Sequence, residues 1–172
     1  MSCSPLPGDI LLCYVPSLLG TAIDTVEEIG LIRQRIPIPR RHPVYSHAAL
    51  YVGNNTVIEA LGRGLVRSRA DKYRGVADVW SADISADERN AITGRGTAMF
   101  RTGYTYSYLD IAVQFVMLTT GLRIPIHMDH SLICSVFTFD AWMGARIQIA
   151  RHRNCAPEDE AVYGVLDFRG AF

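Results

Sequence analysis

A histidine and a glutamate stand close together in a segment whose pattern predicts a β-hairpin. Two strand-like runs, residues 46–52 and 56–61, flank a Gly-Asn-Asn loop at residues 53–55, and both residue types tolerate the positive φ of tight turns. With a three-residue loop, alternation places His47 and Glu59 on one face as diagonal neighbours. A carboxylate there can fix the tautomer of the imidazole and raise its basicity. A two-residue loop would instead place the two side chains on opposite faces.

A cysteine stands at the start of a second patterned segment. From Leu132 the apolar residues recur at helical spacing, so Cys134 is expected in the first turn of a helix. The partial positive charge at a helix N-terminus stabilises a thiolate and lowers the pKa of the thiol. Beside a histidine, such a cysteine can attack a carbonyl carbon. Cys134 is therefore the candidate nucleophile, with His47 as its base.

The other three cysteines show no pattern that predicts chemistry. They form no CxxC pair and no dense framework, so neither a disulfide scaffold nor a zinc ribbon is expected, and the thiols are expected to be reduced. Cys13 falls in an apolar strand and is expected in the core. Cys3 and Cys155 fall in terminal or loop segments.

A metal site is the competing interpretation of the region before the helix. The pattern His127-x-x-His130-x-x-x-Cys134, with Asp129 between, offers imidazole and thiolate ligands for zinc. The two histidines lie in a proline-flanked loop without an obvious partner cluster, so no cofactor is expected. If this alternative holds, the purified protein should contain bound metal.

The remaining pattern predicts an α+β chain. A capping box at Ser85 and Glu88 starts a helix that runs to about Thr102. Residues 62–71 are expected as a loop or a short strand. Turn signals and apolar spacing predict further elements, in chain order a strand at 10–15, a helix at 17–32, a strand at 76–80, a helix at 109–120 and a strand at 163–168.

Length and charge restrict the class of protein. The 172 residues and zero net charge fit a single domain over residues 1–172, with no global field that favours nucleic acid. The longest apolar stretch, 111–122, is shorter than the roughly 20 residues of a membrane span. The N-terminus lacks the pattern of a secretion signal, so a cytoplasmic or phage- or virion-delivered protein is expected. A proline-rich, arginine-rich segment at 33–43 is either a solvated loop or a rim that attracts an anionic substrate.

The order of these motifs resembles the NlpC-type papain-like superfamily, in its circularly permuted, YiiX-like branch, where the histidine strand precedes the cysteine helix. The resemblance spans about residues 7–168. Two features depart from it: Ser135-Val136 replaces the Ser-Glu that often follows the cysteine, and the simplest members lack the long basic segment before the histidine. The motifs that carry the resemblance are Pro7-Gly8-Asp9-Ile10, residues 45–53, Val57-Ile58-Glu59-Ala60 and Ile133-Cys134-Ser135.

The resemblance implies a papain-like fold in which a small antiparallel sheet packs on helices that include the nucleophile helix. It implies Cys134 as nucleophile, His47 as general base and then acid, and Glu59 as the residue that orients the histidine. The backbone N–H of Cys134 is the expected oxyanion donor.

A tyrosine often precedes the cysteine helix in the permuted branch, where it lines the site or helps to hold the oxyanion. Tyr106 is the best match in this chain. Tyr104 and Tyr108 match almost as well, and ordinary packing is the alternative for all three.

The expected activity is cleavage of a peptide-type amide, such as a bacterial cell-wall peptide, through an acyl-cysteine intermediate. Hydrolysis of a lipid amide or ester, or acyl transfer, is an alternative that the same branch implies. A non-catalytic binding or structural module of the same fold is an alternative of a different class. The intact set of Cys134, His47 and Glu59 favours an enzyme, because a retired site usually loses at least one of its residues.

Overall fold

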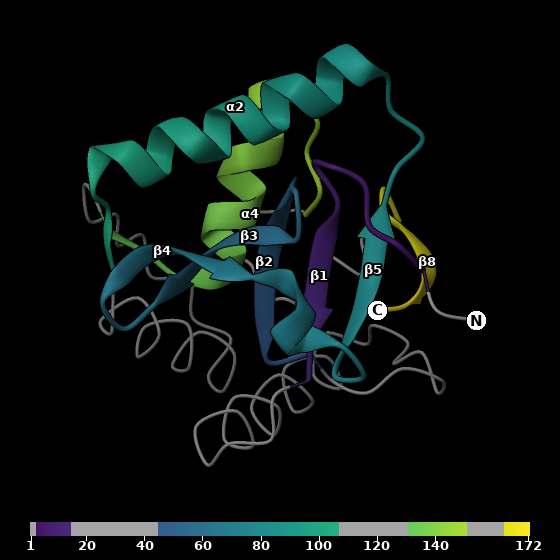
Figure 1. Cartoon of the computed structure of the whole chain (residues 1–172). Coiled ribbons are helices and arrows are strands. Elements are labelled where there is room, and N and C mark those ends of the chain that lie inside the picture. Colours follow the sequence, from purple (N-terminus) through teal and green to yellow (C-terminus); the bar gives the residue numbers. More distant parts are fainter. Residues whose placement is uncertain (1–2, 15–44, 107–130, 151–163) are drawn as a thin grey trace, which may run out of the picture.

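A six-stranded antiparallel sheet is the centre of the computed structural model, which describes residues 3–14, 45–106, 131–150 and 164–172 (Figure 1). The strands lie in the order β4-β3-β2-β1-β5-β8, so the N-terminal strand is central. The sheet and the helices confirm the predicted α+β class. The strand bounds are β1 Ile10–Cys13, β2 His47–Gly53, β3 Thr56–Leu61, β4 Gly64–Arg69, β5 Ala77–Ser81 and β8 Asp167–Ala171.

Two α-helices lie within the described residues and pack against each other (Figure 1). Helix α2 spans Ala86–Thr102 and helix α4 spans Cys134–Trp142. No helix in the described part of the chain is long and apolar enough to cross a membrane. The smaller elements are the 3-10 helices η1 (Ala70–Tyr73) and η2 (Met143–Ala145) and the parallel pair β6 (Thr105–Tyr106) and β7 (Ser131–Leu132).

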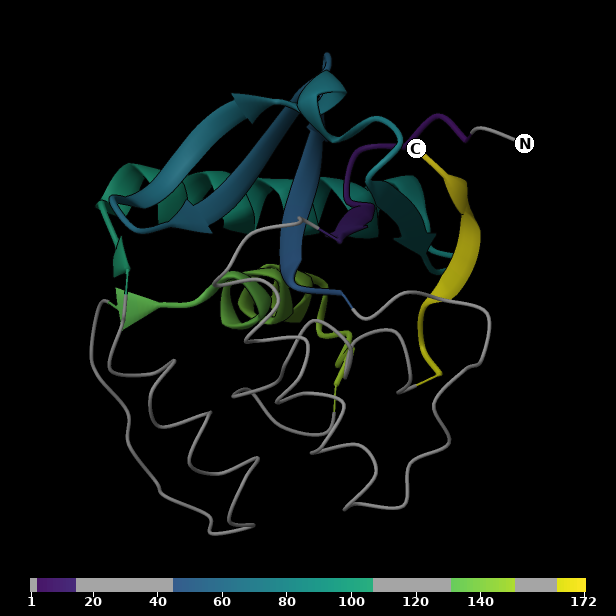
Figure 2. The same cartoon turned by 90° about the horizontal axis from the view of Figure 1, so that it is seen from below.

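Alternation of side chains along the strands divides the core between the two faces of the sheet. Even-numbered residues such as Leu12, Leu50 and Ile58 pack with both α-helices in the larger cluster. Odd-numbered residues such as Leu11 pack with Tyr73 of η1 in a smaller cluster. Figure 2 shows α4, in green, on one side of the sheet. His47 and Glu59 are odd-numbered, so they belong to the face that η1 covers.

Helix α2 begins at the capping box and ends at Thr102, as its sequence predicts. The Ser85 hydroxyl accepts a hydrogen bond from the Glu88 amide at 3.3 Å, and the Glu88 carboxylate accepts one from the Ser85 amide at 2.7 Å, which completes the capping box. A glycine at position 96 lets the helix approach the sheet closely. A Cβ atom there would stand 2.4 Å from Cδ2 of Leu50.

The Pro-Gly-Asp turn before β1 has a structural role. The carboxylate of Asp9 accepts hydrogen bonds at 2.6 Å from the Ser81 hydroxyl and at 2.6 Å from the Arg89 guanidinium. Asp9 is almost fully buried, so these bonds compensate for its desolvation. The network ties the turn to the end of β5 and to the first part of α2.

The strand predicted at 163–168 is the main correction within the described residues. Residues 164–166 are bends, with Gly164 at φ +85°, and β8 runs instead over Asp167–Ala171. Its residues are mostly exposed and show no apolar alternation, so pairing with the edge of β5 forms this strand. Residues 64–69 form a strand, the second of the two predicted options. The predicted helices at 17–32 and 109–120 and the basic segment at 33–43 lie outside the described residues.

Candidate active site

The β2–β3 hairpin positions the histidine and the glutamate through a turn that differs from the predicted one. The turn has two residues, Asn54 and Asn55, at φ +50° and +54°. A two-residue turn between regular strands would place His47 and Glu59 on opposite faces of the sheet. An irregularity at Val52 adds one residue to β2 and restores the expected register, so that Ala49 pairs with Glu59. The predicted loop was therefore wrong in length, but the predicted shared face is confirmed.

The carboxylate of Glu59 contacts the imidazole of His47. Its Oε2 lies 2.9 Å from Nε2 of His47, and the Glu59 side chain has no exposed surface. A buried carboxylate needs several partners to remain ionised. Within the described residues, Glu59 has three such partners besides His47. The Nζ atom of Lys72 lies 2.5 Å from Oε1, the Tyr73 hydroxyl donates to Oε2, and Ser68 forms a further hydrogen bond with the carboxylate.

The charge on Glu59 is strongly favoured. Burial works against ionisation, but the hydrogen bonds from His47, Lys72, Ser68 and Tyr73 outweigh it and lower the pKa of Glu59 to about 2. Near neutral pH, Glu59 is therefore ionised and places a negative charge beside Nε2 of the imidazole.

Cys134 reaches the same histidine from the other side of the sheet. It is the first residue of α4, and it packs with the helix-side cluster. His47 is the first residue of β2, so its ring lies at the end of the strand, where the N-terminus of α4 meets it through a hydrogen bond between Cys134 and His47. Because Nε2 is engaged by Glu59, Nδ1 is the ring nitrogen left for the thiol.

The surroundings of Cys134 favour the thiolate. Burial raises the pKa of this thiol, but the hydrogen bond and positive charge of His47 and hydrogen bonds from the backbone of Ala48 and Ser135 lower it below the ordinary value of 9.0. Burial also works against protonation of His47. The hydrogen bonds and negative charges of Cys134 and Glu59 overcome that effect and raise the pKa of His47 to about 9.

The site can hold two negative and two positive charges close together. When Cys134 is ionised, its thiolate and the carboxylate of Glu59 are matched by an imidazolium at His47 and the ammonium of Lys72. Cys134 retains 9% exposure and the His47 side chain 12%, so both stand at the edge of the protein interior. Such a pair can supply a nucleophile and a proton to one reacting group.

The predicted site residues have different outcomes. The structure brings Cys134, His47 and Glu59 together as the sequence predicted.

Tyr106 lies in β6, where it pairs with Leu132, two residues before the nucleophile, but its side chain lies outside the described residues. Tyr104 is half-buried against the helix-side core and Tyr108 lies outside the described residues. A tyrosine in the site therefore stays a prediction.

Sequence reasoning missed the groups that hold Glu59. Lys72 and Tyr73 belong to η1, a single short turn that has no periodic pattern, and Ser68 lies on β4. No local signal marks these three residues, because only the folding of β4 and η1 onto β3 brings them to the carboxylate.

The competing zinc pattern stays untested. His127, Asp129 and His130 lie outside the described residues. Within the ranges that the structure does describe, no group of three or more potential ligands is arranged to hold a metal ion. Cys3, Cys13 and Cys134 are free thiols, and Cys13 is fully buried in β1 as predicted.

Comparison with known proteins adds no assignment. No protein-family model matches this chain, and no curated protein matches it significantly. A functional proposal for this protein therefore depends on the geometry of the site and on the motif resemblance.

Proposed function

We propose that this protein is a papain-like cysteine hydrolase that cleaves an amide through an acyl-cysteine intermediate. One observation carries the proposal: Cys134, His47 and Glu59 form a continuous hydrogen-bonded series, and the thiol stands at the N-terminus of a helix. This is the nucleophile, base and orienting residue of a catalytic triad in consecutive contact.

The charges of the series fit acyl transfer. The thiolate of Cys134 attacks the substrate carbonyl carbon, a C–S bond forms, and the carbonyl oxygen takes the negative charge. When the tetrahedral intermediate collapses, the C–N bond breaks and the imidazolium of His47 gives its proton to the leaving amine. The raised pKa of His47, about 9, keeps this proton on the ring near neutral pH.

Deacylation uses the same groups in the reverse order. The neutral imidazole takes a proton from a water molecule, which attacks the thioester carbonyl and releases the acid. The C–S bond breaks, and the thiolate–imidazolium pair is regenerated. Glu59 keeps the ring in the orientation that both steps need, because its own position is fixed by Lys72 and Tyr73.

The helix N-terminus supplies candidate donors for the oxyanion. The first N–H groups of an α-helix have no partner within the helix. The backbone N–H of Cys134 is the proposed oxyanion donor, and the Ser135 backbone already lies at the thiol. The Cys134 N–H would then donate to the oxyanion that forms when the thiol attacks.

A peptide-type amide of the bacterial cell wall is the proposed substrate class, on the strength of the resemblance to NlpC-type enzymes. A lipid amide or ester would use the same thiol chemistry. A panel of muropeptides and acylated lipids distinguishes the two classes by which one is turned over.

The proposal is tested with Cys134→Ala, with Cys3→Ser as the matched control. We expect Cys134→Ala to abolish turnover and covalent labelling by an acylating probe, because it removes the nucleophile. Cys3 stands apart from the site and should be dispensable. Turnover that survives in Cys134→Ala would contradict the proposal. If Cys134 resists labelling in the parent and the panel gives no turnover, the non-catalytic module becomes the better interpretation.

A further inference from the structure

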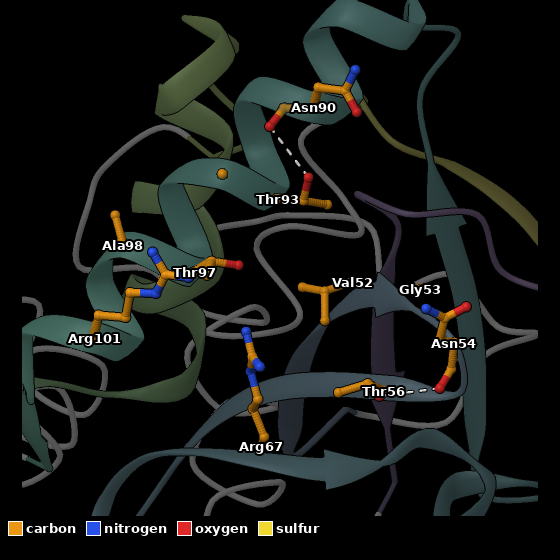
Figure 3. A pocket seen from close by; sticks show the side chains of 11 residues that line it. Val52, Gly53, Asn54, Thr56, Arg67, Asn90, Thr93, Thr97, Ala98 and Arg101 are labelled. Carbon is orange, nitrogen blue, oxygen red and sulfur yellow. Dashed lines mark hydrogen bonds between the residues drawn. The ribbon is translucent and has the colours of Figure 1, made fainter.

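A polar groove lies on the molecule away from the proposed catalytic site. It has a volume of about 460 Å³ and lies between α2, the tip of the β2–β3 hairpin and Arg67 of β4 (Figure 3). Val52 and Gly53 line it, and they stand five to six residues along β2 from His47, which corresponds to roughly 17–20 Å of strand. The volume is in the range of small-molecule sites, about 300–1,000 Å³.

Helix α2 supplies one wall of the groove with small and polar side chains. They recur at helical spacing, so they form a single stripe along the helix. Gly94 opens the middle of this wall, because a Cβ atom there would meet nothing within 4 Å. The residues of the stripe are Asn90, Thr93, Gly94, Thr97, Ala98 and Arg101.

Two guanidinium groups give the groove its charge. Arg67 and Arg101 come from different elements, and Figure 3 shows both side chains at the groove. The lining contains no aspartate or glutamate. Within the described ranges neither arginine forms an ion pair with a carboxylate, although Arg69 and Arg89 do. The groove therefore carries two exposed positive charges that no carboxylate of its lining neutralises.

The side chain of Arg67 lies against helix α2. Its guanidinium carbon lies 5.1 Å from the centre of the Phe100 ring, a cation–π arrangement that modestly favours this position of an exposed side chain. A side chain that is ordered beforehand loses less conformational entropy when a ligand binds. Phe100 precedes Arg101 in α2, so the same turn of helix orients one arginine and provides the other.

The uncharged groups of the groove suit a hydroxylated ligand. The Thr93 hydroxyl donates to the Arg89 carbonyl at 2.9 Å, which leaves its oxygen as an acceptor. The side-chain amides of Asn54 and Asn90 have no hydrogen-bond partner in the part of the chain that the structure describes, so both can donate and accept. These groups can bind hydroxyls beside a charged centre.

We infer that this groove binds a small phosphomonoester, with the phosphate between Arg67 and Arg101 and the hydroxylated remainder along α2. A phosphate dianion matches two guanidinium charges and has enough terminal oxygens to accept hydrogen bonds from both. A carboxylate has one charge and is satisfied by a single guanidinium fork. The site is independent of the thiol chemistry proposed above.

The test is calorimetric titration of the full chain with glycerol 3-phosphate at constant ionic strength. We expect saturable binding, no binding of glycerol, and weaker binding of glycerate, which carries a carboxylate in place of the phosphate. Arg67→Gln and Arg101→Gln should each weaken binding by about tenfold or more, the usual effect of losing a charge-assisted hydrogen bond.

Gly94 provides a matched pair of variants. Gly94→Glu places a carboxylate in the groove and should abolish binding, whereas Gly94→Ala fills little space and should retain it. Far-ultraviolet circular dichroism and the rate of Cys134 alkylation should be unchanged in all four variants, which separates a lost site from a lost fold.

Three results would overturn the inference. One is the absence of saturable binding, and another is equal affinity of the parent and both arginine variants. Equal affinity for glycerate and glycerol 3-phosphate would show that the groove does not select a dianion. Tighter binding to phosphatidic acid vesicles than to the free phosphomonoester would assign the groove to a lipid headgroup instead of a soluble ligand.

Discussion

Nε2 of His47 lies 2.9 Å from Oε2 of Glu59, across a hairpin in which one strand carries an extra residue. The two-residue turn alone would send these side chains to opposite faces of the sheet. The irregularity at Val52 compensates for the turn and returns them to the same face. The contact on which the proposed chemistry depends is thus set by backbone geometry several residues away.

The thiolate–imidazolium pair should be visible in the alkylation rate of Cys134. In the parent, the midpoint of the rate should lie below pH 9.0, the ordinary pKa of the thiol, because His47 lowers that pKa. The ring should lose its proton only as the pH rises through about 9. In His47→Ala, burial acts without the imidazolium, so the pKa of the thiol should rise. Mass spectrometry of the peptide that contains Cys134 follows this thiol alone. Identical pH profiles in the two proteins would show that the residues are not partners.

Glu59→Gln should change how stability depends on acid. The ordinary pKa of this carboxyl is 4.5 and its folded value is about 2. A carboxyl with a lowered pKa contributes stability above its ordinary value, and this contribution is lost as the pH falls from about 4.5 toward 2. The free energy of unfolding, measured by urea titration across this window, should therefore fall more steeply in the parent than in Glu59→Gln. Parallel curves would contradict the low pKa of Glu59.

Tyr73→Phe should weaken the support of Glu59 without removing its charge. The variant loses one hydrogen bond to a buried carboxylate, which should lower the free energy of unfolding by about 1.5 kcal/mol and reduce kcat. Tyr14→Phe is the matched control, since among the described residues its hydroxyl has one hydrogen bond, an exposed bond of 3.3 Å to the Gly75 carbonyl. It should change stability by less than about 0.5 kcal/mol. Equal effects of the two changes would argue against a positioning role for Tyr73.

Two glycines of α2 should respond oppositely to the same substitution. Gly94→Ala adds a methyl group in open space and should stabilise the helix by about 0.5–1 kcal/mol. Gly96→Ala has the same intrinsic gain, but its methyl group would collide with Leu50, so it should be less stable than Gly94→Ala by about 1–3 kcal/mol. Thermal or urea unfolding measures the difference. Equal stability of the two variants would mean that Leu50 repacks freely and that the helix is not closely seated.

Much of the local structure could be predicted because it depends on neighbours in sequence. Alternation and turn chemistry predicted β2 and β3, and the capping box predicted the start of α2. Apolar spacing placed Cys134 in the first turn of its helix. The strand at the C-terminus was misplaced, because β8 is formed by pairing with β5 and carries no apolar pattern of its own.

The sequence by itself determined the residue types of the proposed site, the two strands that carry His47 and Glu59, and the helix that begins at Cys134, since these elements follow from short-range periodicity. The irregularity at Val52, which returns the two side chains to one face, is not marked by that pattern. Only the tertiary structure decided that the thiol of Cys134 meets the ring at the end of β2 from the opposite side of the sheet, and that Lys72 and Tyr73 hold the carboxylate. These contacts join segments far apart in the chain. They depend on how α4 and η1 pack against the sheet, which no local pattern of residues encodes.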